Sequence, residues 1–140
     1  MSDFGLHRVL EPAGSLPVTA WKLDNSPKLR QGEVKVGLHS IVFERENFYQ
    51  LCSICEYDNK EVKERIIKII SERGKLHNPY TESSALFVGT ILEAAPGFDL
   101  GDLKIGDCVV GLTPLAGLPT YIDKIGEIDE YYSKIECSGY

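Results

Sequence analysis

One stretch, Gly89–Leu112, constrains the fold more than any other part of the chain. It opens with a short run of β-favouring residues, Thr90–Leu92, and closes with a second extended apolar run, Cys108–Leu112. Three residue pairs of the kind that mark turns lie between the two runs: Pro96-Gly97, Gly101-Asp102 and Gly106-Asp107. The pattern predicts two β-strands joined by an irregular connection.

The same stretch reads G-x-I-x-E-A, then a spacer rich in Gly and Asp, then L-K-I-G-D-x-V-V. This order resembles the GroES-like catalytic domain of the medium-chain dehydrogenase/reductase superfamily, and the alternating segment Glu33–Leu38 resembles the strand that opens that domain. The resemblance implies a mainly β fold with some α-helix, a partly open β-barrel with a helical insert. It also implies that residues 1–140 are a single catalytic-domain fragment, with the nucleotide-binding domain absent from this chain. An unrelated β-barrel with a Gly-Asp turn is the alternative.

A helical insert is predicted between residues 46 and 74. Asp58 and Glu61 form a variant of the capping box, and the apolar positions of residues 60–73 recur with helical spacing. Gly74 is the expected C-terminal stop of this helix. A shorter helix is predicted over residues 46–56, with Cys52 and Cys55 on its buried face.

The remaining strands are predicted from short apolar or alternating runs. They cover residues 7–10, 18–23, 33–38, 86–93 and 121–128. The final residues, 135–140, carry no helix and no capping signal. A polar loop is predicted over residues 75–84.

Composition excludes several classes of partner. The 140 residues carry a net charge of −6 without a basic run, which argues against nucleic acid and anionic membranes. No apolar run has membrane-spanning length and the first residues do not form a secretory signal. We therefore expect a cytoplasmic protein whose four cysteines are free thiols.

Zinc and cofactor motifs are missing from the sequence. Zinc-dependent members of the superfamily have a cysteine where this chain has Leu38–Phe43 and a Gly-His-Glu where it has Ala85–Phe87, so no zinc is expected. The Cys52-x-x-Cys55 pair lacks the second pair of a structural zinc site. His39 and Cys108 could in principle be recruited as ligands, but a lone histidine beside a strand is more often a hydrogen-bonded structural residue. No G-x-G-x-x-G is present, so NAD or NADP is expected to bind mainly to a domain outside this chain.

A more specific resemblance rests on three segments. They are E-R-G-K-L-H-N-P (residues 72–79) with Thr81, G-T-I (89–91) and L-T-P-L (112–115). Across about residues 33–140 the chain resembles the L-erythro-3,5-diaminohexanoate dehydrogenase family, although it has E-S-S-A (82–85) where the family tends to be rich in Gly and Ser.

The family resemblance implies an NAD(P)-dependent oxidoreductase acting on CH–NH2 groups in lysine fermentation. Such an enzyme oxidatively deaminates a small-molecule amino-acid substrate, a 3,5-diamino acid, to a 5-amino-3-oxo acid. A possible homo-oligomer of the full-length enzyme is part of the same expectation. The fragment alone is expected to be inactive. The alternatives are a zinc-free quinone- or enoyl-reductase-like domain on the same fold, which would take an unsaturated carbonyl substrate, and a non-enzymatic binding domain.

Candidate site residues lie on the loop after the predicted helix. Lys75 supplies a point charge for a substrate carboxylate, His77 can move a proton near neutral pH, and Asn78 supplies an amide. We therefore predict His77 as catalytic and Lys75 with Asn78 as substrate-binding. The structural alternative is that His77 and Asn78 only form the turn before Pro79.

Overall fold

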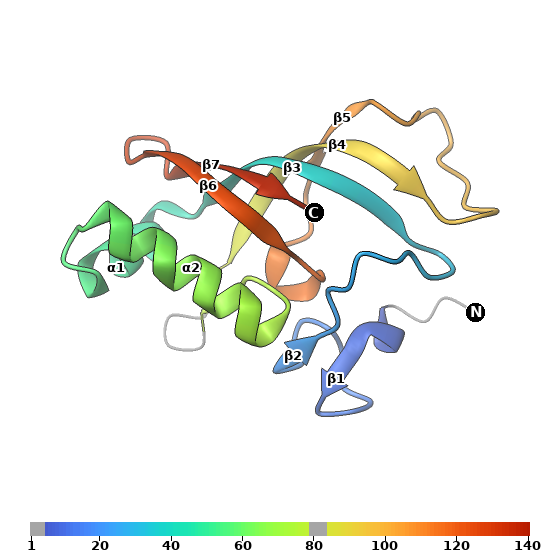
Figure 1. The fold of residues 1–140 in the computed structure, drawn as a ribbon, viewed down its shortest axis with the longest axis horizontal. Coiled ribbons are helices and arrows are strands. Elements are labelled where there is room, and N and C mark those ends of the chain that lie inside the picture. The colour runs from blue at the N-terminus through green and yellow to red at the C-terminus, as the bar shows by residue number, and fades with distance from the viewer. Residues whose placement is uncertain (1–4, 79–83) are drawn as a thin grey trace.

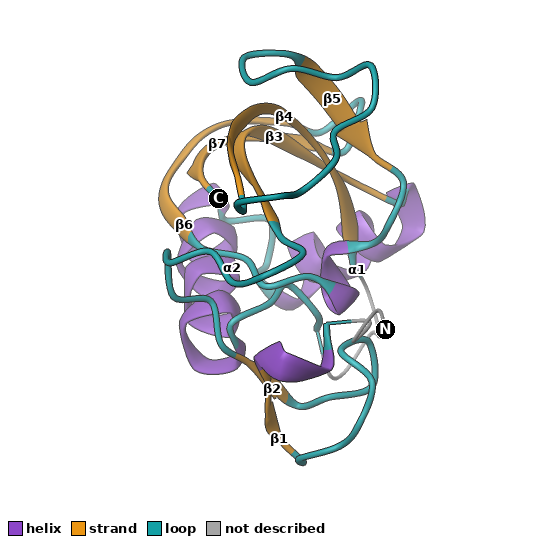
Figure 2. Cartoon of the chain, turned by 90° about the vertical axis from the view of Figure 1, so that its right-hand side faces the viewer, coloured by secondary structure: helices purple, strands orange, loops and turns teal. Residues whose placement is uncertain are grey.

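The structure, a computed structural model, describes residues 5–78 and 84–140 (Figure 1). Its main feature is an antiparallel five-stranded sheet of order β5-β4-β3-β7-β6. The strands are β3 (Val34–Phe43), β4 (Ala85–Ala94), β5 (Cys108–Gly111), β6 (Ile122–Asp129) and β7 (Lys134–Gly139). Since β5 and β6 are not paired with each other, the arched sheet stays open, and the predicted partly open barrel with a helical insert is confirmed (Figure 2).

The stretch that dominates the sequence forms strands β4 and β5, as predicted. Their register runs from Phe87 opposite Gly111 to Thr90 opposite Cys108. In the turn before β5, the Asp107 side chain accepts a hydrogen bond from the amide of Lys104 at 2.8 Å. This hydrogen bond stabilises the Gly-Asp turn, which leads the chain into β5, where it pairs with β4.

The two predicted helices are α1 (Arg45–Ile54) and α2 (Asn59–Arg73). Asp58 caps α2 by accepting hydrogen bonds from the amides of Lys60 (2.8 Å) and Glu61 (3.2 Å). Gly74 ends α2 in the left-handed region with φ 68°. A Cβ at Gly74 would lie 1.9 Å from the carbonyl oxygen of Leu23, so glycine is required for close packing as well as for the turn.

The core lies between the helices and the sheet. Val62, Ile66 and Ile70 of α2 are buried there with residues from β3, β4, β6 and β7. Cys52 and Cys55 are 2% and 0% exposed, which confirms their predicted place in the core. Burial raises the pKa of Cys52 to about 11, so its thiol stays protonated.

Two statements hold for the described residues alone. In residues 5–78 and 84–140, no three His, Cys, Asp or Glu side chains gather in a way that could hold a metal ion. No helix within these ranges is both long and apolar enough to cross a membrane.

The N-terminal residues differ most from their predicted strands. The structure has a 3-10 helix η1 (Leu6–Arg8), then β1 (Val9–Glu11), and only the end of the second predicted strand forms β2 (Lys22–Leu23). The amides of Thr19 and Ala20 both donate to the carbonyl of Leu16, at 3.0 and 2.8 Å, so this segment turns instead of extending. We refer to residues 5–33 as the arm; its β1 and β2 lie apart from the main sheet, beyond one end of α2 (Figures 1 and 2).

One strand is longer than the sequence pattern predicts, and another was not predicted. β3 continues past Leu38 to Phe43 because it pairs along its length with β4 and, at Ser40–Val42, with β7. β7 was not predicted, although Lys134–Ser138 alternates polar and apolar residues. It pairs on one side with β3, which is distant in sequence, and on the other with β6, which precedes it by a short turn.

Candidate functional site

The predicted site residues lie on the loop that follows α2, and this loop is fastened to the arm. Lys75 is fully buried, and its Nζ donates to the carbonyl oxygens of Pro17 (2.8 Å) and Val18 (3.2 Å). Burial, together with the nearby positive charge of Arg73, lowers the pKa of Lys75 to about 8. The ammonium therefore faces the backbone of the arm.

A second cation strengthens the same attachment. The Arg73 guanidinium lies 4.2 Å from the centre of the Trp21 ring, and its Nε donates to the Trp21 carbonyl at 2.8 Å. Its Nη1 donates to the carbonyl of His77, which fixes the course of the loop.

Asn78 is 5% exposed, whereas His77 is half-buried. Pro79 and Thr81, which belong to the motif that marks this loop, lie outside the described residues. The substrate-facing roles of Lys75, His77 and Asn78 stay predictions.

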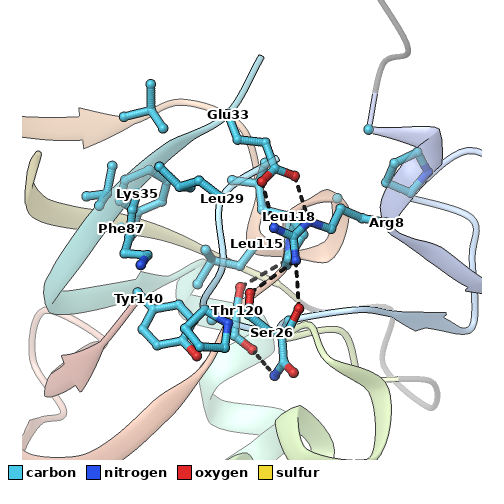
Figure 3. Close-up of a pocket in the computed structure, with 18 of the residues that line it drawn as sticks. Arg8, Ser26, Leu29, Glu33, Lys35, Phe87, Leu115, Leu118, Thr120 and Tyr140 are labelled. Carbon is cyan, nitrogen blue, oxygen red and sulfur yellow. Dashed lines mark hydrogen bonds and ion pairs between the residues drawn. The ribbon is translucent and has the colours of Figure 1, made fainter. Parts of the chain in front are cut away.

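A pocket of about 370 Å³ lies between the arm, the start of β3, the 3-10 helix η2 (Leu115–Gly117) and Tyr140 (Figure 3). This volume is within the range of small-molecule sites. Its lining includes charged, polar and apolar residues: His7, Arg8, Glu33, Lys35, Leu38, Phe87, Leu115, Leu118, Thr120 and Tyr140.

The pocket has an apolar wall and a charged wall. Phe87 of β4 and Leu115 and Leu118 around η2 supply apolar surface. In Figure 3, Phe87 and Tyr140 lie toward one side of the view and Arg8 toward the other, with the Glu33 carboxylate turned to Arg8. Such a mixture suits a ligand that has both an aliphatic chain and charged ends.

The charged wall is organised by a forked ion pair. Arg8, only 4% exposed, donates from Nε to Glu33 Oε1 and from Nη2 to Glu33 Oε2, both at 2.6 Å. Its remaining hydrogen bonds also go to the arm: to the backbone carbonyls of Asp24 (3.1 Å), Ser26 (3.1 Å) and Lys28 (2.7 Å), and to the Ser26 hydroxyl (3.3 Å). Arg8 is thus committed to holding the arm in place and to fixing Glu33.

Glu33 accepts two further hydrogen bonds. The Arg30 amide donates to Oε2 at 2.7 Å, and His7 Nε2 lies 2.7 Å from Oε1. Burial by itself raises the pKa of Glu33, but the hydrogen bonds from Arg8, Arg30 and His7 outweigh it and lower the pKa to about 2. The carboxylate is therefore ionised throughout the neutral range.

Lys35 supplies another cation at the pocket. Its Nζ lies 3.2 Å from a Glu93 carboxylate oxygen and 5.6 Å from the centre of the Tyr140 ring. Tyr140 is fixed in turn by two backbone hydrogen bonds with Tyr121, at 2.6 and 2.8 Å.

The loop and the pocket are separate but share a wall. Pro17 lines the pocket and accepts a hydrogen bond from Lys75. Thr120 also lines the pocket, and its amide donates to the carbonyl of Gly74 at 2.8 Å. Lys75, His77 and Asn78 do not themselves belong to the lining of this pocket.

Sequence reasoning missed the charged wall of the pocket. Arg8 and Glu33 are 25 residues apart, and no spacing rule links them. The available signal was Glu33 at the head of a predicted strand, preceded by an arm with two basic residues at His7-Arg8.

Comparison with known proteins identifies the family. Residues 7–140 match the model of the L-erythro-3,5-diaminohexanoate dehydrogenase N-terminal domain, which extends the resemblance through the arm. The chain is 34% identical over 139 residues to proteins named L-erythro-3,5-diaminohexanoate dehydrogenase from Acetoanaerobium sticklandii and from Fusobacterium nucleatum subsp. nucleatum. In each case the match covers 97% of this chain and 40% of the relative. The chain therefore belongs to the family of L-erythro-3,5-diaminohexanoate dehydrogenase N-terminal domains.

Proposed function

We propose that this chain is the substrate-side domain of an NAD(P)-dependent oxidoreductase that removes the 3-amino group of a 3,5-diamino acid, giving a 5-amino-3-oxo acid and ammonia. The observation that carries the proposal is the family match over residues 7–140, which includes both the arm and the loop after α2. The pocket supports it, because its apolar and charged walls suit a small amino acid with a carboxylate and two ammonium groups. The placement in lysine fermentation and in the cytoplasm is part of the same proposal.

The described residues do not fit a dinucleotide cofactor. Its pyrophosphate needs a helix N-terminus with free amides after a glycine-rich turn. Here the N-cap residues of α1 and α2 are acidic, Glu44 and Asp58. The Asp58 side chain already accepts hydrogen bonds from the amides of Lys60 and Glu61. We propose that the cofactor is bound mainly by residues beyond the 40% of the relatives that this chain matches, on a GroES-like, medium-chain dehydrogenase plan without zinc.

The loop after α2 has a proposed part in the reaction. We assign His77 to acid–base chemistry, and Lys75 with Asn78 to the substrate. His77 is the more exposed of the three. Direct contact between Lys75 and a substrate carboxylate requires the carbonyls of Pro17 and Val18 to release its ammonium, so substrate binding would have to shift the arm.

An assay of the full-length enzyme tests the function. We expect nicotinamide reduction with L-erythro-3,5-diaminohexanoate and no nicotinamide oxidation with an enone. The enone arm matters because the apolar wall formed by Phe87, Leu115 and Leu118 also suits an unsaturated carbonyl compound. Turnover of the enone without turnover of the diamino acid would contradict the proposal in favour of a reductase. A full-length protein with neither activity would favour a binding domain.

A further inference from the structure

A histidine outside the loop after α2 lies at the pocket. The chain has three histidines, at positions 7, 39 and 77, and of these His7 belongs to the lining of this pocket. Its side chain is 27% exposed, so the ring is held by the protein and still accessible. Histidine is the side chain best suited to accept and release protons near neutral pH.

The bond to Glu33 decides which ring nitrogen of His7 carries a proton. Glu33 is an ionised carboxylate and can only accept hydrogen bonds. Nε2, 2.7 Å from Glu33 Oε1, must therefore be the N–H donor. In the neutral ring the lone pair is then on Nδ1, which has no hydrogen-bond partner within residues 5–78 and 84–140.

Glu33 is itself rigid, so it can hold the ring in one orientation. Arg8 grips both carboxylate oxygens, and the Arg30 amide adds a further hydrogen bond. The carbonyl of His7 accepts a hydrogen bond from Arg30 Nη1, which fixes the backbone as well. A base whose ring is oriented by a fixed carboxylate is the usual arrangement for proton transfer at an active site.

We propose that His7, held by Glu33, is the proton acceptor for the reacting ammonium group of a small amino-acid substrate bound in this pocket. The inference rests on the proposed oxidative deamination. In this step an N–H bond of the substrate ammonium breaks, its electron pair stays on the substrate nitrogen, and the proton forms a new N–H bond at Nδ1 of His7. The products are a neutral amine and an imidazolium.

The surroundings favour this transfer. The imidazolium gains an ionic partner in Glu33, and the same pocket has an apolar wall that includes Phe87 and Leu118. Among the described residues, the charged groups joined to His7 in this network are Glu33, Arg8, Arg30 and Asp24, and each of the two arginines is already paired with a carboxylate. Glu33 acts through His7 and is a positioning residue.

The test compares five forms of the full-length enzyme: wild type, His7→Gln, His7→Ala, His39→Gln and Arg30→Met. His39 is the matched control, because it is an exposed histidine bonded to Thr90 at 2.6 Å and lies outside this pocket. Arg30→Met is the structural control, because it weakens the same network without altering the His7 ring. Each form is measured for melting temperature and for kcat/KM as a function of pH.

We expect His7→Gln to lower kcat/KM by about 10²-fold or more and to remove the acidic limb of the pH profile. His39→Gln should match wild type, and Arg30→Met should lower the melting temperature while keeping the limb. In His7→Ala, added imidazole should restore part of the activity. The inference would be overturned if His7→Gln kept the acidic limb of the wild-type pH profile, or if its pH profile matched that of Arg30→Met. Absence of turnover in the wild-type enzyme would overturn the proposed function with it, so the two failures are distinguishable.

Discussion

The loop after α2 and the charged wall of the pocket both bind the arm through a buried cation, but only the cation at the pocket is paired with a carboxylate. At the loop, the fully buried Lys75 faces two backbone carbonyls, and no carboxylate of residues 5–78 and 84–140 forms an ion pair with it. At the pocket, Arg8 and Glu33 neutralise each other through a forked pair. An uncompensated buried cation is costly, whereas a paired and fully hydrogen-bonded one is stable until a partner is removed. The comparison places the stronger anchor of the arm at Arg8 and Glu33.

The two regions respond to pH at opposite ends of the scale. Glu33 has a folded-state pKa of about 2, below the ordinary value of 4.5, so its contribution is present above pH 4.5 and lost as pH falls toward 2. Lys75 has a folded-state pKa of about 8, below the ordinary value of 10.5. The unfolded chain then binds the extra proton between these values, so the contribution of Lys75 to stability rises as pH increases from about 8 to 10.5.

The largest effect is expected from Arg8→Met. It leaves the half-buried Glu33 carboxylate without its forked partner and frees three arm carbonyls, so the free energy of unfolding should fall by about 3 kcal/mol. Urea unfolding followed by fluorescence of Trp21, the single tryptophan, measures this loss. Arg45→Met is the matched control, since Arg45 lies at the surface beside Tyr49 and should cost little. Equal losses of stability in the two variants would contradict the conclusion that Arg8 and Glu33 anchor the arm.

Acid should remove almost as much stability from the wild-type chain. Between pH 4.5 and pH 2, protonation of Glu33 should lower the free energy of unfolding by about 3 kcal/mol. Glu33→Gln should lack this part of the pH dependence while being less stable at pH 7. Parallel stability curves for wild type and Glu33→Gln over this range would show that the Glu33 carboxylate is not the anchor.

At the loop, His77→Ala in the full-length enzyme should lower kcat/KM by about 10²-fold or more, if His77 has the acid–base role we propose. Affinity for the nicotinamide cofactor should change little. A purely structural turn predicts instead a lower melting temperature with nearly normal turnover for each folded molecule. Melting temperature, cofactor affinity and kcat/KM measured on one preparation decide between the two.

A smaller effect is expected from Lys75. The wild-type free energy of unfolding should rise by about 2 kcal/mol between pH 7 and pH 10 as the buried ammonium loses its proton. Lys75→Met should lack this rise, because its side chain does not titrate. Urea unfolding of both forms at the two pH values measures the difference, and an identical rise in Lys75→Met would assign it to another group.

Much of the fold was accessible from local signals in the sequence. The Asp58 cap, the Ile-rich face and Gly74 define α2 without help from the rest of the chain, and the Gly106-Asp107 turn defines the step into β5. β7 has only a short alternation of six residues, without a cap or a turn pair to mark it, and it pairs with strands on both sides. A strand of this kind is set by tertiary contacts more than by its own residues.

The two candidate sites differ in the same way, since one is a local sequence motif and the other is formed by residues distant in sequence. Lys75, His77 and Asn78 are conspicuous because they stand together in one motif. The pocket joins His7, Glu33 and residues near positions 87, 118 and 140, and only the folded chain brings these together. The loop could therefore be predicted from the sequence as a candidate site, whereas the pocket could not.

We propose that the pocket between the arm and the sheet receives the amino-acid substrate. A crystal structure of the full-length enzyme with L-erythro-3,5-diaminohexanoate, without cofactor, tests this proposal. We expect the aliphatic chain to lie against Phe87 and Leu118, with one substrate nitrogen within about 2.6–3.2 Å of His7 Nδ1. A diamino acid bound away from His7, with this pocket filled only by water, would contradict it.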